Sequence, residues 1–396
     1  MEKELYRYNP WWENDFNLLN GLFPREMDKN RIFSNLSNKQ FVFLTGLRRI
    51  GKTSLMRMCI RHLIEHMEVP AGQVLYISLD DYLLKDYTIL QIVESFKKLQ
   101  RLKNKSQIYL FLDEITYAVD YELQLKNLYD QGFCKIFASS SSASLLRSRH
   151  AYLTGRSVTL EILPLDYPEY LQFKNLEVLP SDAHLHETLF KDYLLSGGIP
   201  VYVLSGDDSY IRELMDNIIH KDIAAVHGIR QLQQLKDFFL LLMERSGKTM
   251  SINKGANVLG ISNDTAKRFF DLFCDTYIIY PVGRYGKLNE QMVAPKKIYC
   301  CDTGIKTYYT GVRDWGALFE NYCFLRLKHL SLRYVYQDQT EIDFFTENKW
   351  LIECKFHDEP LSNKQQLLFD GFSAKNKLIL RTYNDVKNTE RSFTKI

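Results

Sequence analysis

The sequence predicts a multi-domain α/β protein, and three observations support this fold class. Between residues 36 and 165, apolar runs of strand length alternate with helical stretches, a pattern typical of a parallel sheet covered on both faces. An all-helical segment follows. From Gly316 onward, one helix leads into short strands that carry polar residues at regular intervals. We therefore expect a parallel-sheet domain followed by smaller domains.

Composition sets the limits within which a function must be sought. The chain has 396 residues, enough for two or three domains at about 150 residues each. Its net charge of +3 excludes a polycation, so any nucleic-acid affinity needs a local basic face. No apolar run approaches the roughly 18 residues of a membrane span, and the first residues lack the apolar core of a signal peptide. Together these features indicate a cytoplasmic protein without a membrane partner.

Cysteine and histidine patterns argue against a zinc site. The 7 cysteines are scattered in apolar surroundings and form no C-x-x-C pair, as in reduced cytosolic proteins. His184 and His186 lack a second pair of ligands nearby.

The stretch "GLRRIGKT" fits G-x-x-x-x-G-K-[ST] and lies between a strand, "QFVFLTG", and a helix, "TSLMRMCIRHLIEHM". Glycines let the backbone N–H groups of such a loop face phosphates, and the helix N-terminus adds its positive dipole end. Lys52 would reach the β- and γ-phosphates of ATP, and the Thr53 hydroxyl would bind Mg²⁺. The expected ATP-binding residues are Gly46, Leu47, Arg48, Arg49, Ile50, Gly51, Lys52, Thr53 and Ser54.

The run "IYLFLDE" ends in two acids at the carboxyl end of an apolar strand. Asp113 is placed to hold Mg²⁺, and Glu114 to act as the general base for an attacking water. The alternative is a solvated acidic pair. Another strand, "QVLYISLD", separates the loop strand from this one in the sequence. Together with the acid beside Asp113, it favours ATP hydrolysis over a GTPase switch.

Two further groups could act on the γ-phosphate. The next strand ends in "ASSSSAS", where Ser139 or Ser141 could sense the phosphate, unless the run is only a serine-rich turn. Arg156, in "YLTGR", could serve as an arginine finger, or it could form a surface ion pair.

The stretch "SINKGANVLGISNDTAKRFFDLF" predicts a helix-turn-helix with Gly260 in the turn, and a hairpin after it suggests a winged helix. From Lys248 to Thr310 there are nine Lys or Arg and five Asp or Glu, an excess of four basic residues. The side chains that could contact DNA phosphates are Lys267, Arg268, Arg284 and Lys287. The alternative is a helix used for packing, because its second half is rich in phenylalanine.

Near the C-terminus, "EIDFFTENKWLIECKF" predicts two strands around a turn. Alternate residues of a strand share a face, so Glu353 and Lys355 should point the same way. With Asp343 they form the pattern of a metal-dependent nuclease centre, in which the acids bind metal and Lys355 acts on the attacking water. Glu320 would add one more acid, and Gln365 or Gln366 could orient the centre. The alternative is a solvent-facing acid-base ladder.

The chain resembles a family of archaeal and bacterial AAA+-type ATPases, because a set of motifs occurs in it in the same order as in that family. The motifs are "NPWW", "GLRRIGKT", "FLDEI", "ASSSSASLL", "LTGR", "LPLDYPEYL", "LLSGGIP", "KKIYCCDTGI", "FEN", "EIDF" and "IECK". The family carries a C-terminal domain of unknown function that resembles PD-(D/E)XK nucleases, and the resemblance covers nearly the whole chain. It implies a P-loop ATPase core, a winged helix and a restriction-endonuclease-like end. Ser140 departs from the pattern, because the family has glycine there.

These observations predict five segments: 1–35, an N-terminal segment; 36–172, the P-loop ATPase core; 173–232, a helical lid; 233–310, the winged helix; and 311–396, the nuclease-like domain. ATP hydrolysis with Mg²⁺ would move the later domains against the core, and the last would act on or hold DNA or RNA. The alternative is a signalling or scaffold ATPase whose nucleotide state switches a surface for a protein partner or a second copy, with the nuclease fold silent.

Overall fold

The computed structural model describes residues 1–143, 153 and 155–394, and these form two compact units. The first unit is Met1–Ile162 and the second is Leu163–Ile396. The first unit thus joins the segment predicted as N-terminal to most of the predicted core. The second contains the segments predicted as lid, winged helix and nuclease-like domain.

A five-stranded sheet forms the centre of the first unit, in the order β2-β3-β4-β1-β5. Every neighbouring pair is parallel, as predicted. The strands are β1 (Phe41–Thr45), β2 (Val74–Ser78), β3 (Ile108–Asp113), β4 (Cys134–Ser140) and β5 (Ser157–Glu161). The strand that separates β1 from β3 in space is the serine-rich β4. The strand that separates them in the sequence, β2, lies at the edge.

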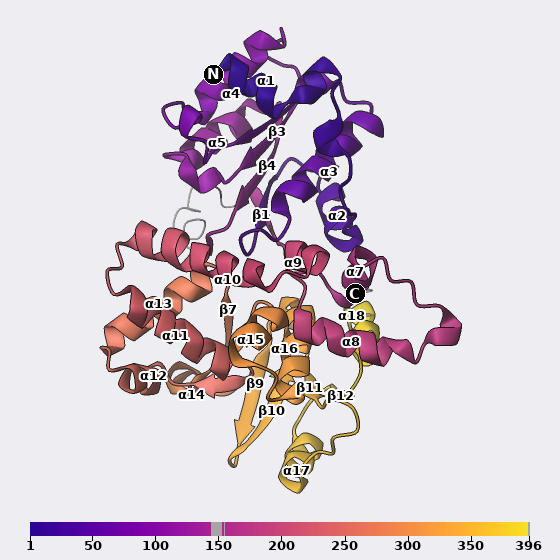
Figure 1. Cartoon of the computed structure of the whole chain (residues 1–396), viewed down its shortest axis with the longest axis vertical. Coiled ribbons are helices and arrows are strands. Elements are labelled where there is room, and N and C mark those ends of the chain that lie inside the picture. The colour runs from indigo at the N-terminus through magenta and orange to yellow at the C-terminus, as the bar shows by residue number, and fades with distance from the viewer. Residues whose placement is uncertain (144–152, 154, 395–396) are drawn as a thin grey trace. The chain divides into compact units, whose positions relative to one another are not determined.

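Helices cover both faces of this sheet, which explains why all five residues of β1 are buried (Figure 1). Helix α3 packs on one face, and α4 and α5 pack on the other (Figure 1). Thr88 and Gln91 form a capping box at the start of α4. The α-helices among the described residues of this unit are α1 (Glu2–Tyr8), α2 (Glu26–Phe33), α3 (Lys52–Glu65), α4 (Ile89–Leu99) and α5 (Tyr121–Gln131).

The "NPWW" stretch covers the open edge of the sheet at β2. The Asn9 amide donates to Tyr76 O at 2.9 Å and accepts from Tyr76 N at 2.6 Å. The indole N–H groups of Trp11 and Trp12 both donate to Val74 O. An edge strand exposes unpaired backbone groups, and here these side chains pair them. The predicted N-terminal segment is therefore part of the first unit.

The second unit begins with a run of helices. They are α7 (Tyr167–Phe173), α8 (Leu185–Ser196), α9 (Pro200–Ser205), α10 (Asp208–Asn217), the π-helix Ile218–Ala225, α11 (Leu232–Arg245), α12 (Ile252–Leu259) and α13 (Asn263–Asp275). Gly260 ends α12 in the left-handed conformation, and the Ser262 side chain caps α13. Two helices joined by a short turn are therefore present where the sequence predicts a helix-turn-helix, and the winged helix stays a prediction.

A small antiparallel sheet accompanies this helix pair, in the order β6-β8-β7. Its strands are β6 (Lys248–Met250), β7 (Ile279–Val282) and β8 (Lys296–Cys300), and α14 (Leu288–Val293) lies between the last two in the chain. Helix α15 (Thr303–Thr310) follows directly, with Asp302 as its N-cap.

A four-stranded sheet ends the chain, in the order β12-β11-β10-β9. The pair β10–β11 is the predicted antiparallel hairpin, whereas β11 and β12 run parallel. The elements are α16 (Trp315–Leu327), β9 (Arg333–Gln337), β10 (Thr340–Phe345), β11 (Trp350–Cys354), α17 (Asn363–Gly371), β12 (Asn376–Leu380) and α18 (Tyr383–Thr394).

One hydrophobic cluster unites the beginning and the end of the second unit. Tyr167 and Tyr193, from α7 and α8, pack with Tyr322, Phe344 and Val386 from the C-terminal elements. The segments predicted as lid and nuclease-like domain thus share a core.

Backbone bonds also join the two sheets of the second unit. Tyr285 N donates to Tyr334 O at 2.7 Å, and Tyr334 N donates to Gly283 O at 3.0 Å. The loop after β7 therefore runs beside β9, which brings the small sheet next to the larger one. Within the part of the chain that is described, no helix is both long and apolar enough to cross a membrane.

The contact at the sheet edge gives a first prediction. Replacing Asn9 with Ala leaves the buried Tyr76 N–H and C=O without these partners, so the first unit should lose about 1–3 kcal/mol of unfolding free energy. Urea unfolding followed by tryptophan fluorescence measures the loss, because Trp11 and Trp12 lie at the same edge. Asn20→Ala, at an exposed position, is the control. An unchanged midpoint for Asn9→Ala would contradict the role given to this side chain.

Candidate nucleotide site and acidic centre

The predicted phosphate loop lies between β1 and α3 with the backbone that the motif requires. Gly51 adopts the left-handed conformation (φ 98°) immediately before α3. Gly46 has φ 133°, and a Cβ there would lie 2.3 Å from Ile162 O, so only glycine fits. Lys52 Nζ donates to Gly46 O and Leu47 O at 3.0 and 2.9 Å. The lysine thus lies over the loop in which phosphates would bind.

Asp113, at the end of β3, collects hydroxyl groups from three elements. Thr53 Oγ1 donates to Asp113 Oδ2 at 2.6 Å, and Tyr76 OH donates to the same oxygen at 2.8 Å. Ser139 Oγ donates to Asp113 Oδ1. A hydroxyl and a carboxylate held together at a phosphate loop fit Mg²⁺, which proteins usually bind through one or two carboxylates plus substrate phosphates.

Glu114 is held in a specific orientation beside Asp113. Its backbone is left-handed (φ 52°), an uncommon conformation for a residue other than glycine and one that clusters at functional sites. Its N–H donates to Ser139 Oγ at 3.0 Å, and Ser141 Oγ donates to Glu114 Oε2 at 3.3 Å. Burial raises the pKa of Glu114 above its ordinary value, with Lys52 acting in the opposite direction. This environment suits a carboxylate that accepts a proton.

The two predicted sensor serines therefore lie next to the two acids. Ser140, the departure from the family pattern, instead forms a local turn with Ser142, whose N–H donates to Ser140 Oγ at 3.0 Å. Because Ser140 bonds locally, it leaves Ser139 and Ser141 directed at the acids.

The structure does not bring Arg156 to this site. Arg156 directly precedes β5, and its carbonyl accepts a hydrogen bond from Phe41 N at the start of β1. Phosphates bind at the other, carboxyl ends of these strands, a strand length away. The Arg156 side chain lies 3.9 Å from Asp130 Oδ1 and over the Tyr129 ring. The predicted role as an arginine finger for the same chain's nucleotide is therefore corrected.

The C-terminal hairpin brings together most of the residues predicted there. Glu353 Oε2 accepts from Asp343 N at 3.1 Å, while Glu353 Oε1 lies 3.2 Å from Lys355 Nζ and accepts from Gln365 Nε2 at 3.0 Å. Asp343 Oδ2 accepts from Cys354 N at 2.8 Å. Glu353 and Lys355 thus share a face, and Gln365 orients Glu353. Gln366 does not join them, because its amide donates to Asp370.

Four carboxyl groups, those of Glu320, Glu341, Asp343 and Glu353, lie around this hairpin and are called the acidic centre. A lysine from the neighbouring sheet enters it. Lys297 Nζ, from β8, lies 2.7 Å from Glu320 Oε1, 2.6 Å from Glu341 Oε1 and 2.8 Å from Asp343 Oδ1. Among the residues that the structure describes, no three Asp, Glu, His or Cys side chains are arranged to hold a metal ion. Glu320 and Asp343 instead bind the ammonium of Lys297 in this structure, and the expectation that they hold a metal ion together with Glu353 stays a prediction.

Burial and charge act together on the ionisation of this centre. Burial opposes the charged form of Lys297, but Asp343, Glu320 and Glu341 raise its pKa well above the ordinary value. Burial and the nearby Asp343 charge raise the pKa of Glu320 and that of Glu353. Burial first, and then the excess of carboxylates over ammonium groups, therefore makes Glu320 and Glu353 favour the protonated form.

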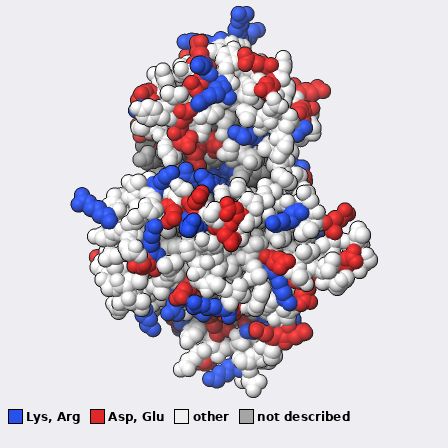
Figure 2. Space-filling view, viewed as in Figure 1, with Lys and Arg blue, Asp and Glu red and all other residues white. Residues whose placement is uncertain are grey.

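The four residues expected to contact DNA phosphates fall into two groups, two exposed lysines and two arginines that bond backbone carbonyls. Lys267 and Lys287 are exposed. Arg268 Nη2 donates to His227 O at 2.5 Å, and Arg284 Nη2 donates to Tyr336 O at 2.6 Å, so both guanidinium groups also hold their own unit together. Acidic and basic side chains are interspersed over the face drawn in Figure 2.

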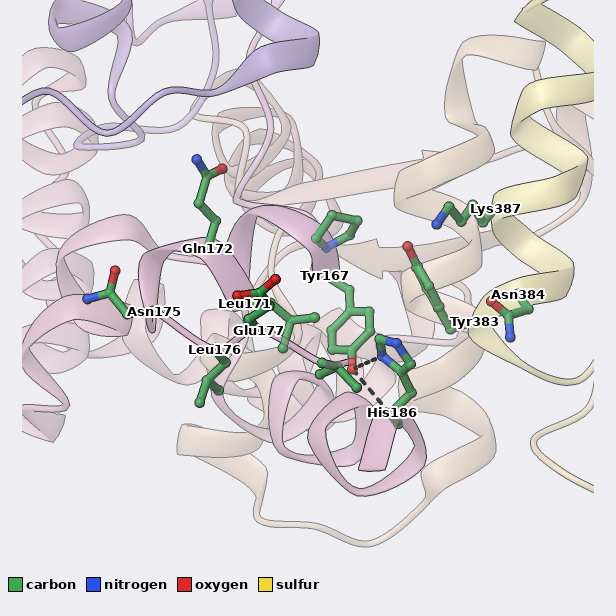
Figure 3. A pocket seen from close by; sticks show the side chains of 12 residues that line it. Tyr167, Leu171, Gln172, Asn175, Leu176, Glu177, His186, Tyr383, Asn384 and Lys387 are labelled. Carbon is green, nitrogen blue, oxygen red and sulfur yellow. Dashed lines mark hydrogen bonds between the residues drawn. The ribbon is translucent and has the colours of Figure 1, made fainter. Parts of the chain in front are cut away.

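The second unit also has an open hollow of about 600 Å³ (Figure 3). Its wall includes Tyr167, Leu171, His186, Tyr383 and Lys387, and Tyr167 OH lies 2.9 Å from His186 Nδ1. None of its lining residues belongs to the nucleotide site or to the acidic centre, so the hollow is separate from both.

Two residues escaped the sequence analysis. Tyr76 bonds Asp113 from the middle of an edge strand, where "QVLYISLD" shows only a continuous apolar run. Lys297 lies in "KKIYCC", and the one available indication was a lysine inside an apolar strand two residues before Tyr299, on the same face. Tyr299 OH also donates to Glu320, at 2.5 Å.

Comparison with known proteins gives a family match that covers the phosphate loop and β3 of the first unit. Residues 38–171 match the family model described as "AAA domain", and residues 187–315 match "Domain of unknown function (DUF8612)". The second match ends before the hairpin that carries Asp343 and Glu353, so the nuclease resemblance stays a prediction.

Curated relatives share most of the chain. An uncharacterized protein of Methanocaldococcus jannaschii is 27% identical over 368 residues, covering 86% of this chain and 81% of its own. An uncharacterized protein of Haemophilus influenzae is 25% identical over 318 residues, covering 76% and 78%. A Walker-type ATPase of Pyrococcus abyssi aligns in structure with a TM-score of 0.46 and 13% identity, covering 72% of this chain and 95% of that one. The family match confirms that the chain contains a P-loop AAA domain.

Proposed function

We propose that this protein binds ATP with Mg²⁺ in the first unit and hydrolyses it. The observation that carries the proposal is the 2.6 Å bond from Thr53 to Asp113, which joins the phosphate loop to the acidic end of β3. The match to the AAA domain over residues 38–171 supports it.

Each residue then has a defined task. Lys52 turns from the carbonyls of the loop to the β- and γ-phosphates. Thr53 and Asp113 would hold Mg²⁺, which would supply positive charge against the charge that develops on the phosphates. Glu114 accepts a proton from the attacking water, and Ser141 keeps its carboxylate in place. Ser139 fixes Asp113 and the backbone of Glu114 at once.

Two substitutions separate binding from chemistry. Lys52→Ala should abolish phosphate release because it removes the cation at the phosphates. Glu114→Gln should retain ATP binding and lower kcat by about 10²–10⁴-fold, the usual contribution of a general base. Nucleotide titration and a phosphate-release assay on the same samples check both. Arg156→Ala is the control on the opposite edge of the sheet. Unchanged release by Lys52→Ala would refute the proposal.

We further propose that the second unit binds nucleic acid through α13 and the loop after β7, the two recognition elements of a winged helix. The support is the helix-turn-helix, the basic excess between Lys248 and Thr310, and the exposure of Lys267 and Lys287. Phosphate contacts of this kind give salt-dependent binding without sequence preference.

The double variant Lys267→Ala/Lys287→Ala tests this surface. It should weaken duplex binding, and the slope of log K against log salt should become shallower by about 0.9 for each lost phosphate contact. Fluorescence anisotropy at several salt concentrations measures both, with Lys3→Ala in the first unit as control. Equal affinity and slope in variant and wild type would instead favour the scaffold alternative, in which this unit contacts a protein.

A second candidate function is metal-dependent cleavage of nucleic acid at the acidic centre. The favouring observation is that Asp343, Glu353, Lys355 and Gln365 converge as a nuclease of the PD-(D/E)XK type requires. In this reading Asp343 and Glu353 hold the metal, and Lys355 positions the attacking water.

Cleavage is tested on linear DNA, supercoiled DNA and RNA, in Mg²⁺ or Mn²⁺, with and without ATP. Asp343→Asn and Lys355→Ala should both remove the cleavage seen with wild type, since each removes a group that acts in the reaction. Gln366→Ala, whose side chain points to Asp370, should cut as wild type does. Absence of cleavage under every condition, or equal cleavage by all variants, rejects this candidate.

A further inference from the structure

Lys297 reaches the acidic centre from a different sheet. It lies on β8, opposite Thr249 of β6 and Val282 of β7, and not on the hairpin that carries Asp343 and Glu353. Its neighbour Lys296 points away, with Nζ 3.3 Å from Gln291 O. The strand alternation thus sends one lysine into the centre and leaves the other at its surface.

The Lys297 ammonium is fully coordinated by carboxylates. An ammonium has three N–H donors, and Nζ lies 2.6–2.8 Å from one oxygen each of Glu320, Glu341 and Asp343. Only 2% of the side chain is exposed, so water does not compete for these donors. The ammonium donor is charged, so the bonds are charge-assisted, and they are short as such bonds usually are.

Such a position is also the one that a hard divalent cation would need. Mg²⁺ and Mn²⁺ prefer carboxylate oxygens, and the Lys297 nitrogen lies between oxygens from three carboxylates. A divalent ion that binds the same oxygens would stand next to a buried positive charge. The two cations therefore exclude each other through repulsion that solvent screens little.

We propose that Lys297 is the built-in cation of the acidic centre, so that the centre folds without a metal and admits a divalent ion only when Lys297 withdraws. Lys297 thereby acts as an autoinhibitory contact on the second candidate function, and the proposal concerns the same residues as that candidate. The two are tested separately, because occupancy by a metal can be measured without nucleic acid and without ATP.

The experiment measures Mn²⁺ binding by the nucleotide-free full chain. Four proteins are compared by calorimetry and by the Mn²⁺ electron paramagnetic resonance signal: wild type, Asp343→Asn, Lys297→Ala, and the double variant Lys297→Ala/Asp343→Asn. Lys296→Ala is the control for loss of a lysine from the same strand. Any Mn²⁺ bound at Thr53 and Asp113 is common to all of them and cancels in the differences.

Lys297→Ala should bind one more Mn²⁺ per chain than wild type, and the double variant should lose that ion. The thermal midpoint of Lys297→Ala should rise with Mn²⁺ concentration more than that of wild type or Lys296→Ala. The reason is that a ligand that binds only the folded state stabilises it. Wild type and Asp343→Asn should bind equal amounts of Mn²⁺.

Two results would overturn the proposal. The first is a lower Mn²⁺ stoichiometry in Asp343→Asn than in wild type, which would show that a metal enters beside Lys297. The second is a folded Lys297→Ala chain that gains no Mn²⁺. If Lys297→Ala does not fold, Lys297→Met, which keeps the apolar stem and removes the charge, takes its place in the same comparison.

Discussion

The nucleotide site depends on the insertion of β4 between β1 and β3. In this sheet, Leu44 of β1 pairs with Ser139, and Leu112 of β3 pairs with Ala138. Ser139 therefore lies beside Asp113, and the phosphate loop follows β1, the next strand on the other side of β4. Because the carboxyl ends of parallel strands share an edge, one serine can bond both the Asp113 carboxylate and the backbone N–H of Glu114.

The features that the sequence predicts correctly are formed by residues that lie close together in the chain. The phosphate loop, the acids of β3 and the β10–β11 hairpin each span a few residues, so local spacing revealed their geometry. The strand order was not readable, because it depends on pairing between distant segments, and Tyr76 was missed for the same reason. Arg156 was misplaced because a residue that precedes a strand lies at the edge opposite to the ligand.

In the acidic centre, too, the sequence predicts the residues that lie near one another in the chain and misses the one that comes from a distant segment. Its hairpin partners Asp343, Glu353 and Lys355 were foreseen, because two strands and a turn fix their distances. Lys297 comes from another sheet and changes the chemistry of the whole group. Burying several carboxylates is costly unless cations and hydrogen bonds compensate them. Here two lysines, an amide and backbone N–H groups do so, and burial shifts Glu320 and Glu353 toward their neutral forms.

The aromatic cluster that joins α7 and α8 to the C-terminal elements has a mechanical consequence. Tyr167 and Tyr193 cannot leave Tyr322 and Phe344 without exposing a large apolar surface to water, which opposes any sliding of the early helices past the last sheet. The early helices and the last sheet of the second unit should therefore move together rather than separately. The division between the two compact units falls outside this cluster, between Ile162 and Leu163.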